Sequence, residues 1–209
     1  MRSQALRRVR RLPTLALAAG AVLAAPLRGQ VGIAVAAGVR YSTVLVHDQI
    51  GGAFDVRPAL APAFAVTASL PLDPPWSAVA VADFSTSDVR REDADGSSQT
   101  ITRLSQATLA LGLRRRLKPW LSGSVRVGVL KYFPSQDLGL FQDGGPFFPF
   151  AQAAFDVAPA PLSRLGLGFE LSADVHRFIT DALRVEGFTD ARVVGRIAGG
   201  VTWTPGRPR

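Results

Sequence analysis

Apolar and polar residues alternate with a period of two along most of the chain after residue 30. In the segment 165–176 (LGLGFELSADVH), every second residue from Leu165 to Val175 is apolar, and the residues between them are small, polar or charged. This is the period of a β-strand with one apolar and one polar face. The helical spacing of i, i+3, i+4 and i+7 is not sustained after residue 30. The alternation predicts eight strands, at residues 31–46, 60–72, 76–88, 99–116, 120–133, 147–158, 164–178 and 191–204.

The connections between the predicted strands alternate between short and long. Those at 71–77, 115–120 and 158–164 are short and contain proline, whereas those at 47–60, 87–99, 134–146 and 179–190 are longer and rich in Asp, Gly, Ser or Gln. This alternation predicts an antiparallel up-and-down meander with both chain ends on the side of the short turns. The predicted fold class is therefore all-β, with the eight strands closed into a barrel.

The first 29 residues have the features of a cleavable signal peptide. Basic residues between Arg2 and Arg11 precede an apolar run from Leu12 to Ala25. That run is too short to span roughly 30 Å of hydrocarbon as a helix. We expect cleavage after Gly29, with an N-terminal membrane anchor as the alternative. The mature chain then consists of a barrel over residues 30–204 and a short tail over residues 205–209.

The charge and cysteine content exclude several classes of function. The formal net charge is +8, but six arginines and no acidic residue lie within residues 1–30, so the remaining chain carries only +2. This balance removes the argument for a nucleic-acid partner. The absence of cysteine and the presence of only two histidines exclude disulfides, thiol nucleophiles and a three-histidine metal centre within one chain. We therefore expect no metal and no other cofactor.

Aromatic residues gather near the ends of the predicted strands. The three tryptophans fall at the short-turn ends, and other aromatic residues fall towards the opposite ends. Two such girdles are typical of a barrel that crosses both interfaces of a membrane. The predicted girdle residues are Tyr41, Trp76, Phe84, Trp120, Tyr132, Phe133 and Trp203. The parity of its strand directs Trp120 inward unless the turn rotates it. Aromatic residues that cap the core of a soluble secreted barrel or sandwich are the alternative.

Together, the leader, the eight strands, the alternating connections and the aromatic rims resemble the small eight-stranded bacterial outer-membrane β-barrels, the superfamily that includes the outer-membrane protein A barrel. The final strand also resembles the C-terminal signal of such barrels, with Arg196, Ala198, Val201 and Trp203 at the characteristic places. Alanine replaces the usual glycine there, and the chain continues as TPGRPR. The resemblance implies a monomeric transmembrane barrel in the outer membrane, in contact with lipid and lipopolysaccharide and inserted by the barrel assembly machinery.

Charged residues are expected inside the barrel, because eight strands leave an interior just wide enough for side chains to fill. Counting along the strands predicts a lumen network of Arg40, Asp83, Arg126, Glu170, Asp174, His176 and Arg196. Enclosed charges need partners, so we expect Glu170 and Arg196, on adjacent strands, to form an ion pair with Arg126 and Asp83 close by. The network is either a static polar core, which we favour, or a gate whose ion pairs exchange partners.

No catalytic site is expected. Ser172, Asp174 and His176 share one face of one strand, but alternation alone produces this arrangement. Ser172 lies about 13 Å from His176 at the usual rise per residue of a strand, too far for a nucleophile and its base. We therefore predict that the protein is not an enzyme.

Two long connections differ in character. Residues 87–98 carry charges of both signs, which indicates a solvated hairpin tip where Arg90 and Arg91 are candidates for contact with lipopolysaccharide phosphates. Residues 134–149 are apolar enough to fold over the barrel mouth. The candidate lid residues are Leu138, Leu140, Phe141, Phe147 and Phe148.

The sequence thus predicts a non-enzymatic outer-membrane barrel with a structural or surface-interaction role. One alternative is a narrow channel or a conduit for small hydrophobic molecules, and another is a soluble secreted lipocalin-like binding protein. A lipid-facing barrel keeps its apolar residues outside and its polar residues inside, whereas a soluble binder does the reverse. The direction of the two faces therefore separates the last alternative from the others.

Overall fold

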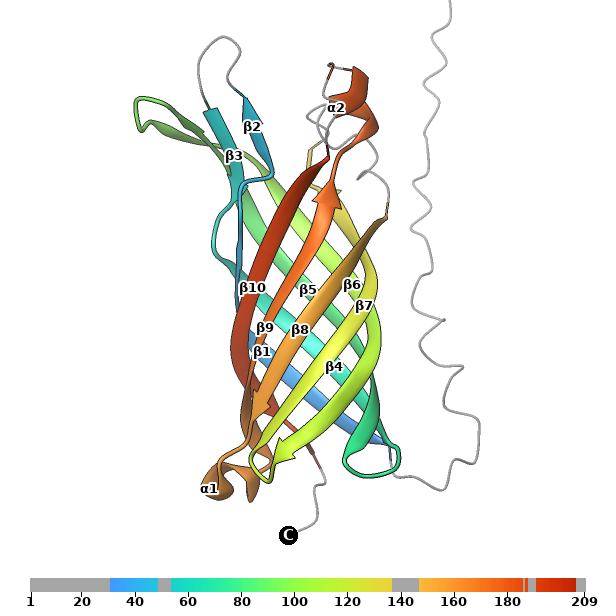
Figure 1. The fold of residues 1–209 in the computed structure, drawn as a ribbon. Coiled ribbons are helices and arrows are strands. Elements are labelled where there is room, and N and C mark those ends of the chain that lie inside the picture. The colour runs from blue at the N-terminus through green and yellow to red at the C-terminus, as the bar shows by residue number, and fades with distance from the viewer. Residues whose placement is uncertain (1–30, 49–53, 137–146, 186, 188–190, 206–209) are drawn as a thin grey trace, which may run out of the picture. The chain divides into compact units, whose positions relative to one another are not determined.

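The computed structural model describes residues 31–48, 54–136, 147–185, 187 and 191–205. These residues form one antiparallel sheet that closes into a barrel (Figure 1). The expected signal peptide at residues 1–29 and the end of the tail, from residue 206, lie outside the described residues. Neither described helix has the length and apolar character needed to cross a membrane.

Eight strands make up the ring, and each pairs with the next one along the chain. They are β1 (Gly32–Ser42), β4 (Ala61–Pro71), β5 (Trp76–Asp93), β6 (Ser98–Lys118), β7 (Leu121–Pro134), β8 (Phe148–Val157), β9 (Leu167–Phe178) and β10 (Arg192–Trp203). Antiparallel pairing of β1 with β10 closes the ring. The predicted eight-stranded up-and-down barrel is therefore confirmed.

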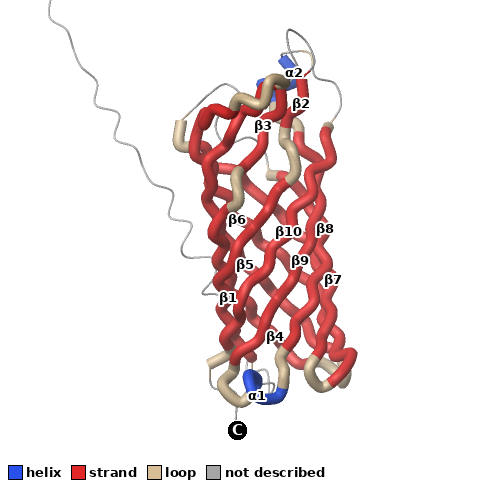
Figure 2. Tube along the Cα trace, turned by 90° about the vertical axis from the view of Figure 1, so that its left-hand side faces the viewer, coloured by secondary structure: helices blue, strands red, loops and turns tan. Residues whose placement is uncertain are grey.

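The short connections lie at one end of the barrel, here called the turn end, and the long ones lie at the opposite loop end (Figures 1 and 2). Residues 72–75 join β4 to β5, and residues 119–120 join β6 to β7. Residues 158–166, which include the short helix α1 (Ala160–Ser163), join β8 to β9. Since β1 begins and β10 ends at the turn end, the described chain enters and leaves the barrel on the predicted side.

The loop end contains regular structure that the alternation does not predict. β5 continues past its expected end at residue 88, and a turn with Gly96 at φ 83° leads into β6. β3 (Phe54–Pro58) pairs with the end of β5, placing Phe54 opposite Asp93, and β2 (Val46–Asp48) pairs with β3. The helix α2 (Asp181–Val185) lies in the last long connection. Much of the connections expected at 47–60 and 87–99 is therefore an extension of the sheet.

Apolar side chains face outward and polar side chains face inward through the middle of the barrel. On β7, Val127 is 67% exposed, whereas the neighbouring Arg126 is 2% exposed. Other strands follow the same rule, with exposed apolar residues that include Val39, Phe64, Leu109, Leu111, Phe169, Leu171 and Ile197. A water-soluble barrel buries its apolar residues, so this arrangement contradicts the lipocalin-like alternative. It is the arrangement of a barrel whose outer face contacts lipid.

Glycine allows the first and last strands to approach closely where the ring closes. Gly38 of β1 lies opposite Gly200 of β10. A Cβ atom added to Gly38 would lie 2.1 Å from the carbonyl oxygen of Gly199 and 2.5 Å from the Cα atom of Gly200. No side chain fits at that separation, so this seam between β1 and β10 depends on glycine.

Candidate functional site: the barrel lumen

Among the described residues, four ion pairs lie inside the barrel and join residues of seven strands. They are Arg40–Asp83 at 2.7 Å, Arg196–Asp174 at 2.6 Å, Arg126–Glu170 at 3.0 Å and Arg114–Asp156 at 3.2 Å. Each acidic residue is matched by one arginine, so these groups add no net charge to the interior. Such matching offsets the cost of removing charges from water.

The pair between Arg196 and Asp174 is the most enclosed. The two residues are direct partners in the β9–β10 register, and the Nε atom of Arg196 donates a hydrogen bond to Asp174. Its Nη1 atom donates to Oε1 of Gln106 at 3.0 Å, across the lumen on β6. The guanidinium also lies 5.5 Å from the ring centroid of Phe150. Arg196 of β10 therefore contacts polar and aromatic side chains from three other strands.

Arg126 of β7 binds Glu170 of β9 across the intervening strand β8. Its Nη1 atom donates to Oε1 of Glu170 at 3.0 Å and to Oε1 of Gln152 at 3.1 Å. Its Nη2 atom donates to the second oxygen of Glu170 at 3.4 Å. The two nearly parallel hydrogen bonds to one carboxylate give a bidentate contact that fixes both side chains.

The expected ion pair between Glu170 and Arg196 is wrong. Both residues face the interior, but the register places Arg196 opposite Asp174 and places Gly200 opposite Glu170. Glu170 is therefore displaced from Arg196 by four residues, or about 13 Å along the strand. The long side chain of Arg126 occupies the position expected for Arg196.

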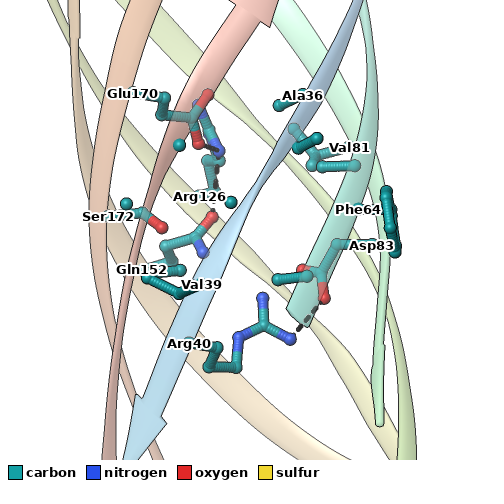
Figure 3. Close-up of a pocket in the computed structure, with 17 residues that line it drawn as sticks. Ala36, Val39, Arg40, Phe64, Val81, Asp83, Arg126, Gln152, Glu170 and Ser172 are labelled. Atoms are coloured by element: carbon teal, nitrogen blue, oxygen red, sulfur yellow. Dashed lines mark hydrogen bonds and ion pairs between the residues drawn. The ribbon is translucent and has the colours of Figure 1, made fainter. Parts of the chain in front are cut away.

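Arg40 and Asp83 form the third enclosed pair, as Figure 3 shows. The Nη1 atom of Arg40 donates to Asp83 and also to the hydroxyl of Ser85 at 3.1 Å. The hydroxyl of Thr108 donates to the other carboxylate oxygen of Asp83. Asp83 does face inward, and Val81 of the same strand is buried beside it.

A small cavity lies beside these groups and is lined by residues of β1, β4, β5, β7, β8, β9 and β10, which Figure 3 draws as sticks. Its volume is about 40 Å³, and it is lined by Asp83, Arg126, Glu170 and small residues that include Ala36, Gly38 and Gly200. A cavity of this size and polarity is large enough for only a few water molecules. The cavity has room for water beside the ion pairs and is too small for an organic ligand.

An apolar plug fills the interior towards the loop end, beyond the ion pairs. Tyr132, Phe148 and Phe178 pack with ring centroids 5.4–5.6 Å apart, and the Tyr132 hydroxyl lies 2.8 Å from Nε2 of His176. The plug also contains Leu45, Val46, Val56, Val89, Leu104, Leu130, Phe150, Leu183 and Val194. These residues come from the ring, from the β2–β3 hairpin and from α2, so the loop end closes over its own core.

Two predicted aromatic positions are therefore wrong. Tyr132 was expected in the outer girdle, but it is fully buried because it shares the inward parity of Arg126 on β7. Phe148 was expected in a lid, but it begins β8 and points into the plug. Phe147 is exposed and lies 4.9 Å from the ammonium of Lys131. The other lid candidates, Leu138, Leu140 and Phe141, lie outside the described residues.

The remaining girdle residues face outward. They are Tyr41, Trp76, Phe84, Trp120, Phe133 and Trp203, each between 43% and 49% exposed. Trp120 lies in the two-residue turn between β6 and β7, and its ring contacts Lys118, which precedes the turn. The turn therefore rotates this side chain away from the direction that strand parity predicts.

Charged residues at the loop end pair with one another. Arg57 binds Glu92 at 2.5 Å, and Arg91 binds Asp93 at 2.7 Å while stacking 4.1 Å from the ring centroid of Phe54. The hairpin expected to have a solvated tip is also paired with β3. At its tip, hydrogen bonds from the side chain and then the backbone of Ser97 lower the pKa of Asp95 below its usual value.

Among the described residues, Ser172, Asp174 and His176 form no hydrogen bonds with one another. The hydrogen bond of His176 joins it to Tyr132 and not to Ser172 or Asp174. Within the described ranges, no group of three or more His, Cys, Asp and Glu side chains is placed to hold a metal ion.

Comparison with known proteins identifies the architecture. No family model matches the sequence, and no curated protein matches it. Among solved structures, the outer membrane protein Ail of Yersinia pestis in a phospholipid bilayer nanodisc is 14% identical, covers 84% of this chain and 99% of its own, and gives a TM-score of 0.50. The chain has the fold of the small outer-membrane β-barrels. OprG of Pseudomonas aeruginosa, at 11% identity, 84% and 96% coverage and a TM-score of 0.45, is also an outer membrane protein.

Sequence reasoning placed the ionisable lumen residues on the inner face but missed the apolar plug. The signal was present, because Leu130 and Tyr132 share the parity of Arg126 on one predicted strand. The contributions of Leu45 and Leu183 had no such signal. They depend on how the long connections fold back into the barrel mouth.

Proposed function

We propose that this protein is a non-enzymatic barrel of the bacterial outer membrane that keeps its lumen closed and acts as a scaffold at the cell surface. In this proposal, residues 1–29 are a cleaved signal peptide, and the barrel assembly machinery inserts residues 30–204 as a monomer surrounded by phospholipid and lipopolysaccharide. The observation that carries the proposal is the filling of the interior by two successive layers, the ion pairs and the apolar plug.

The two layers favour a closed barrel over a channel. A conducting lumen needs a continuous polar path, whereas the rings of Tyr132, Phe148 and Phe178 pack together in the interior. Next to them, Arg126 and Arg196 are each held by two or more hydrogen bonds and are nearly inaccessible. Either layer alone is enough to block ions.

The sheet extension supports a role at the surface. β2, β3 and the outer parts of β5 and β6 continue the sheet beyond the ring, and side-chain ion pairs such as Arg57–Glu92 connect them. An ordered extension at the loop end presents backbone and side chains in a fixed arrangement, which suits recognition of a partner.

The first test is membrane fractionation followed by gel mobility of the detergent-extracted protein with and without boiling. We expect the protein in the outer-membrane fraction, with a heat-dependent shift in mobility. A protein recovered from the soluble fraction without a shift would overturn the proposal.

The second test is conductance in planar lipid bilayers. We expect no channel activity from the wild type, from Glu170→Ala, or from Phe148→Ala with Phe178→Ala, because each retains at least the plug or the ion-pair layer. The three changes together weaken both layers and should give measurable conductance. The matched control replaces Phe64 and Phe84, which face outward, and should stay silent. Conductance by the wild type would instead support the narrow-channel alternative.

A further inference from the structure

The exposed basic residues that end β6, at the turn end of the barrel, have no acidic partner among the described residues, unlike several arginines at the loop end. At the loop end, Arg57, Arg91, Arg103 and Arg184 each form an ion pair with an acidic residue. At the turn end, β6 finishes with the sequence RRRLK, and none of its exposed cations, Arg115, Arg116 and Lys118, has an acidic partner among the described residues. Asp73 is the single acidic residue in the described short turns.

Two of these cations are held against tryptophan rings on the outer surface. The guanidinium of Arg115 lies 5.5 Å from the ring centroid of Trp76, and the ammonium of Lys118 lies 5.8 Å from that of Trp120. Tryptophan rings favour the boundary between hydrocarbon and headgroups. The contacts therefore place positive charge at the depth of lipid phosphates.

An apolar hollow lies on the outer surface. It begins two residues along β6 from Arg115, further from the turn end. Its volume is about 590 Å³, and its outward-facing lining includes Leu113, Val125, Val127, Ala151, Ala153 and Ala173.

The strand register connects the cations to this hollow. Arg115 lies opposite Gly123, and the next outward row along the strands places Leu113 opposite Val125 and Val125 opposite Ala153. Rows of outward residues are about 7 Å apart along a strand, so the backbone of Arg115 lies one row from the hollow, while its guanidinium lies over Trp76 of β5.

From this arrangement we propose that the turn-end face of β6–β8 binds an anionic phospholipid. Arg115 and Lys118 contact the phosphate and the negatively charged headgroup, and the acyl chains lie in the apolar hollow that includes Ala153. The inference rests on the proposed outer-membrane location, because only a bilayer presents such a lipid to this face. Charge complementarity favours an anionic headgroup over a zwitterionic one, since unpartnered cations gain most from a net negative charge.

The test is native mass spectrometry of the full chain released from detergent after incubation with phosphatidylglycerol or phosphatidylcholine carrying the same acyl chains. Each of the two cations near an anionic lipid is worth a factor of about five in binding, so we expect a preference of about twenty-five-fold for phosphatidylglycerol. Arg115→Gln with Lys118→Gln should abolish that preference.

The control for net charge is Arg103→Gln with Arg184→Gln, which removes two exposed cations at the loop end and should leave the preference intact. Equal retention of both lipids by the wild type would overturn the inference. So would an equal loss of the phosphatidylglycerol preference in the two double variants. A second copy of the chain bound in place of lipid would do the same. The heat-dependent mobility shift, measured on each sample, separates this failure from failure of the barrel itself.

The hollow is tested separately by filling it. Ala153→Leu should weaken retention of phosphatidylglycerol, whereas Ala82→Leu, at an exposed position on β5, should not. Unchanged retention in Ala153→Leu would overturn the placement of the acyl chains.

Discussion

Replacing Asp174 by Ala should destabilise the barrel strongly, because it leaves the charge of Arg196 inside without its carboxylate. The side chains of Arg196 and Asp174 are 0% and 4% exposed. After the substitution, Arg196 retains its hydrogen bond to Gln106 and its contact with Phe150. Neither of these groups carries a compensating negative charge.

The expected loss follows from the burial of the pair. Removing one partner of a buried ion pair costs about 3–5 kcal/mol, and the remaining contacts of Arg196 place Asp174→Ala near the lower limit. The exposed pair of Arg103 and Asp88, 3.4 Å apart, contributes no more than about 1 kcal/mol. Asp88→Ala is therefore the matched control. Asp174→Leu combined with Arg196→Met removes both charges and should restore most of the stability.

The assay is equilibrium unfolding by urea in lipid vesicles, followed by tryptophan fluorescence. Trp76, Trp120 and Trp203 face outward, so unfolding transfers all three from lipid to water and changes their emission. A loss for Asp174→Ala no larger than that for Asp88→Ala would refute the reasoning. A double variant as unstable as the single Asp174→Ala variant would also contradict it, because the unpaired charge would then not be the cause.

Three further predictions concern the seam, the outer face and the turn at the hairpin tip. Gly38→Val should prevent or strongly impair ring closure, while Gly195→Val, whose nearest neighbouring atom is 3.7 Å from an added Cβ, should fold; heat-dependent gel mobility measures both. Val127→Arg on the outer face should lower the free energy of unfolding in vesicles by about 2–4 kcal/mol, whereas Val185→Arg on α2 should change it little. The hydrogen bonds that lower the pKa of Asp95 stabilise the tip at pH values above the usual pKa of aspartate. This contribution should disappear as the pH falls through the lowered pKa, and an NMR titration would report it.

The strands were predictable because one physical rule governs them. A wall between lipid and a polar interior requires every second residue to be apolar, so the segment from Leu165 to Val175 indicates both its strand and its faces. The rule stops applying above the membrane, where β2 and β3 are held by the apolar plug and by pairing with β5. Such contacts join distant residues and leave no local period.

The ion-pair partners were less predictable than the residues themselves. Strand parity is local, and it places Glu170, Asp174 and Arg196 on the inner face. The register between β9 and β10 depends instead on how the connection containing α2 folds, and a shift of four residues separates the expected partner of Arg196 from the observed one. Trp120 shows the same limit at the other end, because a tight turn and not the strand sets its direction.

Because the ring closes at the seam between Gly38 and Gly200, the hydrogen-bonded ring does not depend on where the chain begins and ends. In the completed ring, β1 and β10 are neighbours like any other pair, and no strand of the ring has an unpaired edge. The described chain enters and leaves beside this seam, at the same end as the short turns. A circular permutant with its original ends joined and new ends opened within residues 158–166 would therefore contain the same hydrogen-bonded circle, traversed from a different starting point.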